Sequence, residues 1–114
     1  MKEFIIKKSR KIIIYGASVV GIDLYQKLIK KNFQVIAFID KRAEEIKSIY
    51  DIPVYFENLN TLDNKDNCLV IIAVKNVFEH EDIADFLKKK GFYNLLYRPM
   101  DVLDGGKSPE AIRL

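Results

Sequence analysis

The residues best placed to do chemistry in this chain lie in the short segment GASVVG at 16–21. The apolar run KIIIY precedes this segment at 11–15, and a helical pattern of apolar residues follows it. A glycine turn between a strand and a helix leaves backbone N–H groups unpaired at the positive end of the helix dipole. Such a position attracts the phosphates of a nucleotide. The spacing therefore predicts a nucleotide-type ligand, without indicating a reaction.

The segment departs from the dinucleotide fingerprint G-x-G-x-x-G at its middle glycine, where Ser18 stands. Gly16 supplies the tight turn, and Gly21 lets the helix pack closely on the strand. A serine side chain crowds the approach of the pyrophosphate, although its hydroxyl can donate to a phosphate. The candidate contacts of the turn are Gly16, Ala17, Ser18, Val19 and Gly21. The alternative is a turn whose glycines serve packing alone.

A carboxylate ends the second apolar run, QVIAFI at 34–39, because Asp40 follows it directly. An acid at this place accepts the hydroxyls of a ribose in dinucleotide-binding folds. Asp is also a preferred helix N-cap, and the two roles are compatible. Lys41 is a further candidate contact, since Lys41 and Arg42 could each meet a phosphate, including a 2′-phosphate. An exposed helix start is the favoured interpretation of this basic pair.

The chain contains a weak internal repeat. A shift of 59 residues lays Leu28–Phe33 over Leu87–Phe92 and strand over strand. Each copy is a β-α-β unit, and two such units give a parallel sheet with covering helices. The second copy has no glycine opposite Gly16 or Gly21. This difference favours a ligand at the turn of the first copy over glycines that serve packing alone.

Asn76 follows the strand expected at 69–74, at the same edge of the sheet as the glycine turn. Ligands of doubly wound sheets bind outside the carboxyl ends of the strands. Asn76 is therefore a candidate ligand contact, with capping of the next helix as the alternative. The single histidine, His80, is interpreted as a packed or capping residue rather than a catalyst.

The pattern predicts a three-layer, Rossmann-like α/β domain with a mostly parallel five-stranded sheet of order near 3-2-1-4-5. Pro53 lacks a ladder donor, so its strand is expected at an edge. Residues 1–100 form this domain, and 101–114, with a Gly pair and a Pro, form a linker or tail that could lead into a further domain. Strands are expected at 11–15, 34–39, 53–56, 69–74 and 94–98, and helices at 19–31, 42–49 and 79–90.

Composition excludes several classes of protein. With 49% hydrophobic and 31% charged residues, the chain is expected to be globular and cytoplasmic, and no apolar run approaches the about 20 residues of a membrane span. Cys68 is the single cysteine and opens an apolar strand, so it is expected to be buried, and no metal set is expected. The lysine clusters lie at helix ends without interleaved aromatic residues, so no nucleic-acid partner is expected.

No catalytic set can be assembled from the 114 residues. The chain has a single His, and no Ser-His-Asp triad can be argued from it. Short-chain dehydrogenases pair a catalytic Tyr with a Lys four residues later, and none of the six tyrosines of this chain has a lysine at that position. Whether the protein is an enzyme stays open at this point. Catalysis is expected to come from another domain or chain.

The chain resembles small Rossmann-like domains of bacterial surface-sugar pathways. The matching segments are KIIIYGAS–G at 11–21, QVIAFID at 34–40, IPVYFENL at 52–59 and CLVIIAVKN at 68–76. It is similar to the N-terminal domain of left-handed-helix sugar acetyltransferases. It is also similar to the nucleotide-binding domain of nucleotide-sugar dehydratases and of some glycosyl- and methyltransferases. The resemblance implies a phosphate turn at 16–21, the ribose acid at Asp40 and a cleft-lining Asn76.

Three functions follow from these features. The first is a nucleotide or nucleotide-sugar binding module of a larger polysaccharide-biosynthesis enzyme such as a transferase, with NAD(P) or a UDP-sugar as ligand. The second is the NAD(P)-binding half of an oxidoreductase, or of a sugar dehydratase or epimerase. The third is an interaction domain that has lost its ligand and assembles through the Val19-Val20 face. The expected partners are a linked catalytic domain or a second copy of the chain.

Overall fold

The computed structural model describes residues 10–63 and 65–97, so the predicted tail at 101–114 lies outside the described residues. Parallel strands alternate with helices along most of this stretch, as predicted. The strands are β1 (Lys11–Tyr15), β2 (Gln34–Ile39), β3 (Ser48–Ile49), β4 (Ile52–Tyr55), β5 (Cys68–Ile72) and β6 (Leu95–Tyr97). The helices are α1 (Val19–Lys30), α2 (Ala43–Ile46) and α3 (His80–Lys89), with single 3-10 turns at Leu59–Thr61, Lys65–Asn67 and Val77–Glu79.

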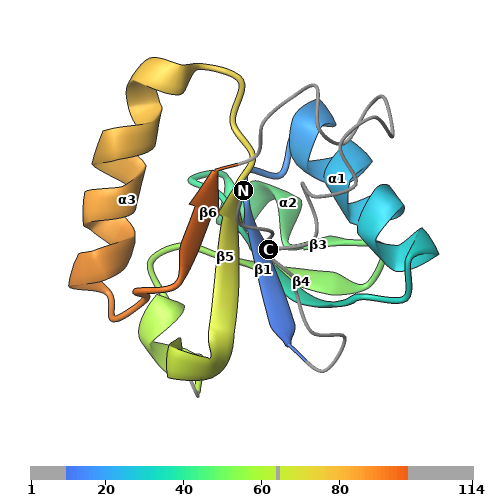
Figure 1. The fold of residues 1–114 in the computed structure, drawn as a ribbon, viewed down its shortest axis with the longest axis horizontal. Coiled ribbons are helices and arrows are strands. Elements are labelled where there is room, and N and C mark those ends of the chain that lie inside the picture. The colour runs from blue at the N-terminus through green and yellow to red at the C-terminus, as the bar shows by residue number, and fades with distance from the viewer. Residues whose placement is uncertain (1–9, 64, 98–114) are drawn as a thin grey trace, which may run out of the picture.

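The strands form one sheet in the order β3-β4-β2-β1-β5-β6 (Figure 1). β1 lies in the centre and pairs in parallel with β2 and β5, while β4 and β6 extend the parallel sheet on either side. The predicted Rossmann-like α/β fold is confirmed, but the predicted count of five strands is wrong. The sixth strand is β3, and the other five lie in the order 3-2-1-4-5 when they are numbered without it.

The unpredicted strand belongs to a tight hairpin between β3 and β4. β3 pairs antiparallel with β4, and only Tyr50 and Asp51 separate the paired ends. Both loop residues have positive φ, 50° and 66°, as two-residue hairpin turns of type I′ require. The helix expected at 42–49 therefore ends at Ile46, and β4, which carries Pro53, is not the outermost strand.

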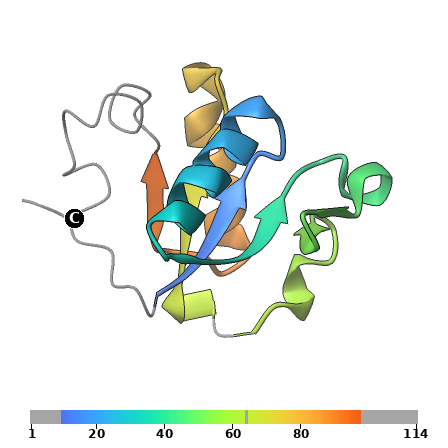
Figure 2. The same cartoon turned by 90° about the vertical axis from the view of Figure 1, so that its right-hand side faces the viewer.

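Both faces of the sheet are covered, which explains why β1 is apolar after its first residue. Ile12 and Ile14 belong to the buried cluster under α1, whereas Ile13 and Tyr15 belong to the cluster under α3. Figure 2 shows α1 in front of the sheet and α3 behind it. A strand buried on both faces is expected to be apolar throughout, because neither set of side chains meets water.

The internal repeat reappears at the ends of the two long helices. Asn32 and Gly91 both have positive φ, 67° and 96°. The N–H of Phe33 then donates to the carbonyl five residues earlier at 3.0 Å, and the N–H of Phe92 does the same at 2.9 Å. Such bonds close a helix with a left-handed residue. Both phenylalanines are buried, Phe33 in one cluster with Leu28 of α1 and Phe92 in the other with Leu87 of α3.

Candidate functional site

The glycine turn lies at the carboxyl end of β1, against the end of β5. Gly16 has φ +113°, and its N–H donates to the carbonyl of Ile39 at 2.8 Å. A Cβ built on Gly16 would lie 2.6 Å from the carbonyl oxygen of Ala73. The fold itself therefore requires a glycine here. The structural role that the alternative assigned to the glycines is therefore observed, and the binding of a ligand at this turn stays a prediction.

Gly21 has an equally direct structural role, because it brings α1 against the turn. A Cβ built on Gly21 would lie 1.7 Å from the carbonyl oxygen of Gly16. The predicted close packing of the helix is thus observed. Its consequence is that the amino end of α1 sits directly on the turn, where its unpaired amides gather.

Two of these amides are bare. α1 begins at Val19 after Ser18, whose backbone is extended and whose side chain makes no capping hydrogen bond. Among the described residues, the N–H groups of Val19 and Val20 donate to no acceptor, whereas the N–H of Ala17 donates to Oδ2 of Asp40 at 2.8 Å. The amides of Val19 and Val20 are therefore free backbone donors at the positive end of a helix.

The carboxylate of Asp40 is buried and fully occupied. Only 9% of the residue is exposed. Its Oδ1 accepts the backbone N–H of Arg42 at 2.9 Å and Nε of Arg42 at 3.0 Å. Its Oδ2 accepts the Ala17 N–H at 2.8 Å and Nη2 of Arg42 at 3.1 Å. A carboxylate has about four lone-pair sites, so these four bonds leave no acceptor free for ribose hydroxyls.

Arg42 joins Asp40 to the turn. Besides its bonds to Asp40, its Nη2 donates to Oγ of Ser18 at 2.7 Å. The side chain stays 49% exposed, so the guanidinium lies at the surface above the turn. The interpretation of Arg42 as part of an exposed helix start missed this contact, because it joins side chains 24 positions apart in the sequence. Its neighbour Lys41 is exposed.

The hydrogen bonds to Asp40 predict a specific dependence of stability on pH. Burial alone would raise the pKa of Asp40, but the bonds from Arg42 and the Ala17 amide hold that pKa below its usual value. A lowered folded-state pKa stabilises the protein above the unfolded pKa of about 3.9, and this contribution is lost as pH falls through the folded pKa. Asp40→Asn should therefore lower the free energy of unfolding at neutral pH and have little effect at a pH below both values. Urea unfolding of both proteins at the two pH values measures this. An equal loss at both would contradict it.

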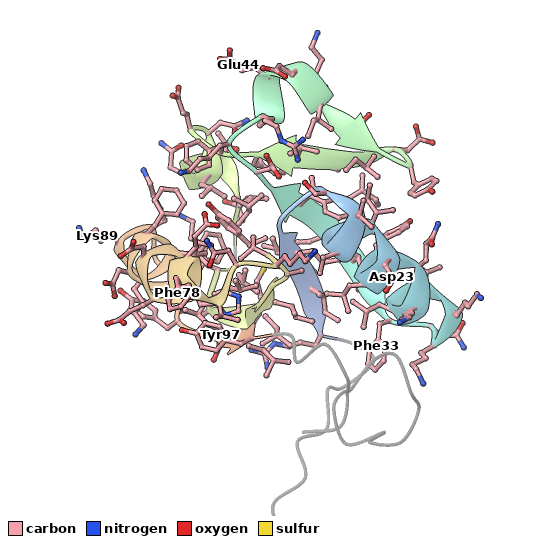
Figure 3. All side chains as sticks on the ribbon, turned by 90° about the horizontal axis from the view of Figure 1, so that it is seen from above. Asp23, Phe33, Glu44, Phe78, Lys89 and Tyr97 are labelled. Atoms are coloured by element: carbon pink, nitrogen blue, oxygen red, sulfur yellow. The ribbon has the colours of Figure 1, made fainter. Side chains whose placement is uncertain are left out.

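Asn76 lies at the same edge of the sheet, since β5 pairs with β1 and Ala73 N–H donates to the Tyr15 carbonyl at 2.8 Å. Its Oδ1 accepts the backbone N–H of Phe78 at 3.0 Å, so the capping alternative is observed, on the 3-10 turn that precedes α3. Figure 3 looks onto this edge and shows Phe78 at the start of that helical segment.

His80 is packed, as predicted. Its Nε2 lies 3.1 Å from the carbonyl oxygen of Val74, and its ring stacks on Tyr97 with centroids 5.1 Å apart. Cys68 is buried, also as predicted, and burial raises the pKa of its thiol. Neither side chain is placed as a nucleophile beside the glycine turn.

The described residues hold no group of three His, Cys, Asp or Glu side chains that could bind a metal ion. Within residues 10–63 and 65–97, no helix combines the length and the apolar character that crossing a membrane requires. What the site offers is a set of donors: two bare amides, the Ser18 hydroxyl and the Arg42 guanidinium. All four suit an anion.

The structure resembles that of a nucleotide-sugar enzyme. No protein-family model matches the chain. No curated protein matches it either. A solved structure, that of UDP-D-quinovosamine 4-dehydrogenase from Vibrio fischeri, aligns with a TM-score of 0.62 and 30% sequence identity over 86% of this chain and 85% of that one. This likeness supports the nucleotide-sugar part of the resemblance seen in the sequence. The acetyltransferase part stays a prediction.

Proposed function

We propose that this chain, a Rossmann-like domain related to a nucleotide-sugar enzyme, binds a nucleotide or nucleotide sugar at the turn formed by residues 16–21. The observation that carries the proposal is the pair of bare amides of Val19 and Val20 at the amino end of α1. Amides in this arrangement bind phosphate, because the N–H groups and the helix dipole both favour negative charge.

The mechanism is positioning. The turn holds the diphosphate outside the carboxyl end of β1, where doubly wound sheets place their ligands. The buried Asp40 fixes the Ala17 amide and the Arg42 side chain in place, so the turn is ordered before a ligand arrives. Catalysis comes from groups outside the described residues, in a linked domain or a second chain.

A second candidate function is favoured by the solved structure described above. Because that protein is a 4-dehydrogenase of a UDP-sugar, this chain could serve as the dinucleotide-binding part of an oxidoreductase. The same turn would then hold the diphosphate of NAD or NADP. A panel of NAD, NADP, UDP-N-acetylglucosamine and coenzyme A separates the two functions, because thermal stability rises only with ligands that bind the folded state. A ligand at 100 times its dissociation constant adds about 2.7 kcal/mol.

The turn itself can be tested by deleting one backbone donor. Val19→Pro removes the Val19 N–H at the first position of a helix, where proline is accepted. The backbone of Ser18 is already extended (φ −107°, ψ −164°), as a residue before proline prefers. Val19 is 82% exposed, so little packing is lost. We expect Val19→Pro to abolish most of the thermal shift given by a nucleotide that stabilises the wild type.

The matched control is Val19→Ala, which shortens the same side chain and keeps the N–H. Its thermal shift should equal that of the wild type. If Val19→Pro keeps the full shift as well, the nucleotide binds elsewhere. Substitution of Gly16 is a poorer test, because a side chain there would strike the Ala73 carbonyl and disturb the fold.

A further inference from the structure

We infer that Arg42 binds the diphosphate of the ligand, and that Asp40 is a positioning residue which holds Arg42 and does not take the ribose hydroxyls. The inference rests on the proposed function and concerns the same site. It replaces the role expected for Asp40 from the sequence, that of a ribose acceptor, with a different one. Four hydrogen bonds to one buried carboxylate carry it.

The guanidinium of Arg42 is held firmly but keeps one edge free. Of its five N–H donors, Nε–H and one on Nη2 go to Asp40, and Nη2 also donates to Ser18. Among the described residues, the two N–H groups of Nη1 meet no acceptor. With the side chain 49% exposed, this free edge can receive a ligand without breaking any existing bond.

Ser18 extends the same donor set into the turn. Its Oγ accepts from Arg42 at 2.7 Å, which leaves the hydroxyl hydrogen available to donate. Ser18 stands where the dinucleotide fingerprint has its middle glycine, the one that lets the pyrophosphate approach bare backbone. The pair of Ser18 and Arg42 thus replaces a backbone contact with a hydroxyl and a cation.

The bonds between Asp40 and Arg42 favour a diphosphate over a ribose diol as the group bound here. A ribose diol that used Asp40 would have to displace Arg42 and lose charge-assisted hydrogen bonds. A diphosphate needs no displacement, because it adds to the free edge of a planar guanidinium that suits phosphate oxygens. The site therefore selects its ligand by the diphosphate, with the ribose making no contact to the carboxylate.

The experiment follows the Arg42 Nε–H and the backbone amides of 16–21 by nitrogen-15 NMR while UDP, uridine, ADP and adenosine are added. For the diphosphate of whichever nucleoside binds, we expect the Arg42 Nε–H and the turn amides to shift, with only small changes at Arg42 for the matching nucleoside. Arg42→Gln should weaken diphosphate binding about 10-fold or more, because a hydrogen bond to a charged group is lost. Arg42→Lys should recover part of this, since lysine keeps the charge without the planar fork.

The matched control is Lys89→Gln, which makes the same change of charge at the far end of α3 and should bind UDP and ADP like the wild type (Figure 3). Unchanged or tighter diphosphate binding by Arg42→Gln would overturn the inference. So would an Arg42 Nε–H that stays still in the wild type when the diphosphate binds, a result independent of how well the variants fold. If Val19→Pro loses binding while Arg42→Gln keeps it, the proposed function stands and the role of Arg42 falls. If no nucleotide binds the wild type, both fall.

Discussion

Gly21→Ala is expected to lower the free energy of unfolding by at least about 3 kcal/mol, the upper end of what overpacking costs. The added Cβ would lie 1.7 Å from the carbonyl oxygen of Gly16 and 2.9 Å from its carbonyl carbon. Both atoms belong to backbone that is fixed on its other side, because Gly16 N–H is bonded to the Ile39 carbonyl. Neither α1 nor the turn can move away alone, so the strand and helix must separate. Urea unfolding followed by circular dichroism measures the loss.

Gly91→Ala is the control for this prediction. Gly91 has φ +96°, and a Cβ there meets first the Cδ of Lys65 at 3.3 Å, part of a flexible side chain. Only the backbone strain remains, worth about 1–2 kcal/mol for a residue with a side chain in a left-handed conformation. A loss for Gly21→Ala no larger than that for Gly91→Ala would show that α1 can shift to make room.

The expected cost at Gly21 bears on how a glycine motif is interpreted. The fingerprint at 16–21 predicted a strand, a turn and a helix correctly, because the close approach of helix and strand demands glycine. The second copy of the repeat enters its helix through a 3-10 turn at Val77–Glu79, so it needs no glycine there. The motif therefore reports local geometry first. The proposal of a ligand rests instead on the amides that this geometry leaves free.

The elements of the sheet could be predicted for the same local reason. Short runs of apolar, β-branched residues and helix-ending residues such as Asn32 are properties of short windows, and these elements appeared within a few residues of the expected bounds. The hairpin of β3 and β4 was not predicted from the sequence. Its loop is Tyr50-Asp51, which contains no glycine or asparagine to indicate two residues of positive φ. Tyr50 and Asp51 adopt a backbone conformation that residues with a side chain disfavour. The packing of the neighbouring strands outweighs that local cost.

The position of the candidate site could be predicted from the sequence, but the hydrogen bonds between its side chains could not. The β-α-β pattern brings residues 16–21 and Asp40 to one edge of the sheet, and the structure joins them through the Ala17 amide. The contact between Ser18 and Arg42 joins residues 24 positions apart and depends on the path of the chain after β2. No local pattern specifies the direction of that side chain. For this reason the contacts of Arg42 with Ser18 and Asp40 could not be foreseen from the sequence.

Phe38→Ala is expected to cost about 3–5 kcal/mol, as for other fully buried phenylalanines. Phe38 is 0% exposed, and its ring packs against Tyr25 of α1 with centroids 5.7 Å apart. Tyr25 in turn stacks on Tyr50 of the hairpin at 5.5 Å. Removal of the Phe38 ring therefore leaves a cavity where β2, α1 and the β3–β4 hairpin meet. The loss is measured by urea unfolding, as for Gly21→Ala.

Phe78→Ala removes the same side chain from a position that is 89% exposed, at the start of the segment leading into α3 (Figure 3). Its effect should stay within about 0.5 kcal/mol, because no buried contact is lost. A comparable cost for the two substitutions would mean that the Phe38 ring is not the centre of this packing. Since Asp40 directly follows β2, the cavity left by Phe38→Ala also loosens the support of the carboxylate that holds Arg42. The variant should therefore bind nucleotide more weakly than Phe78→Ala even under conditions where both proteins are folded.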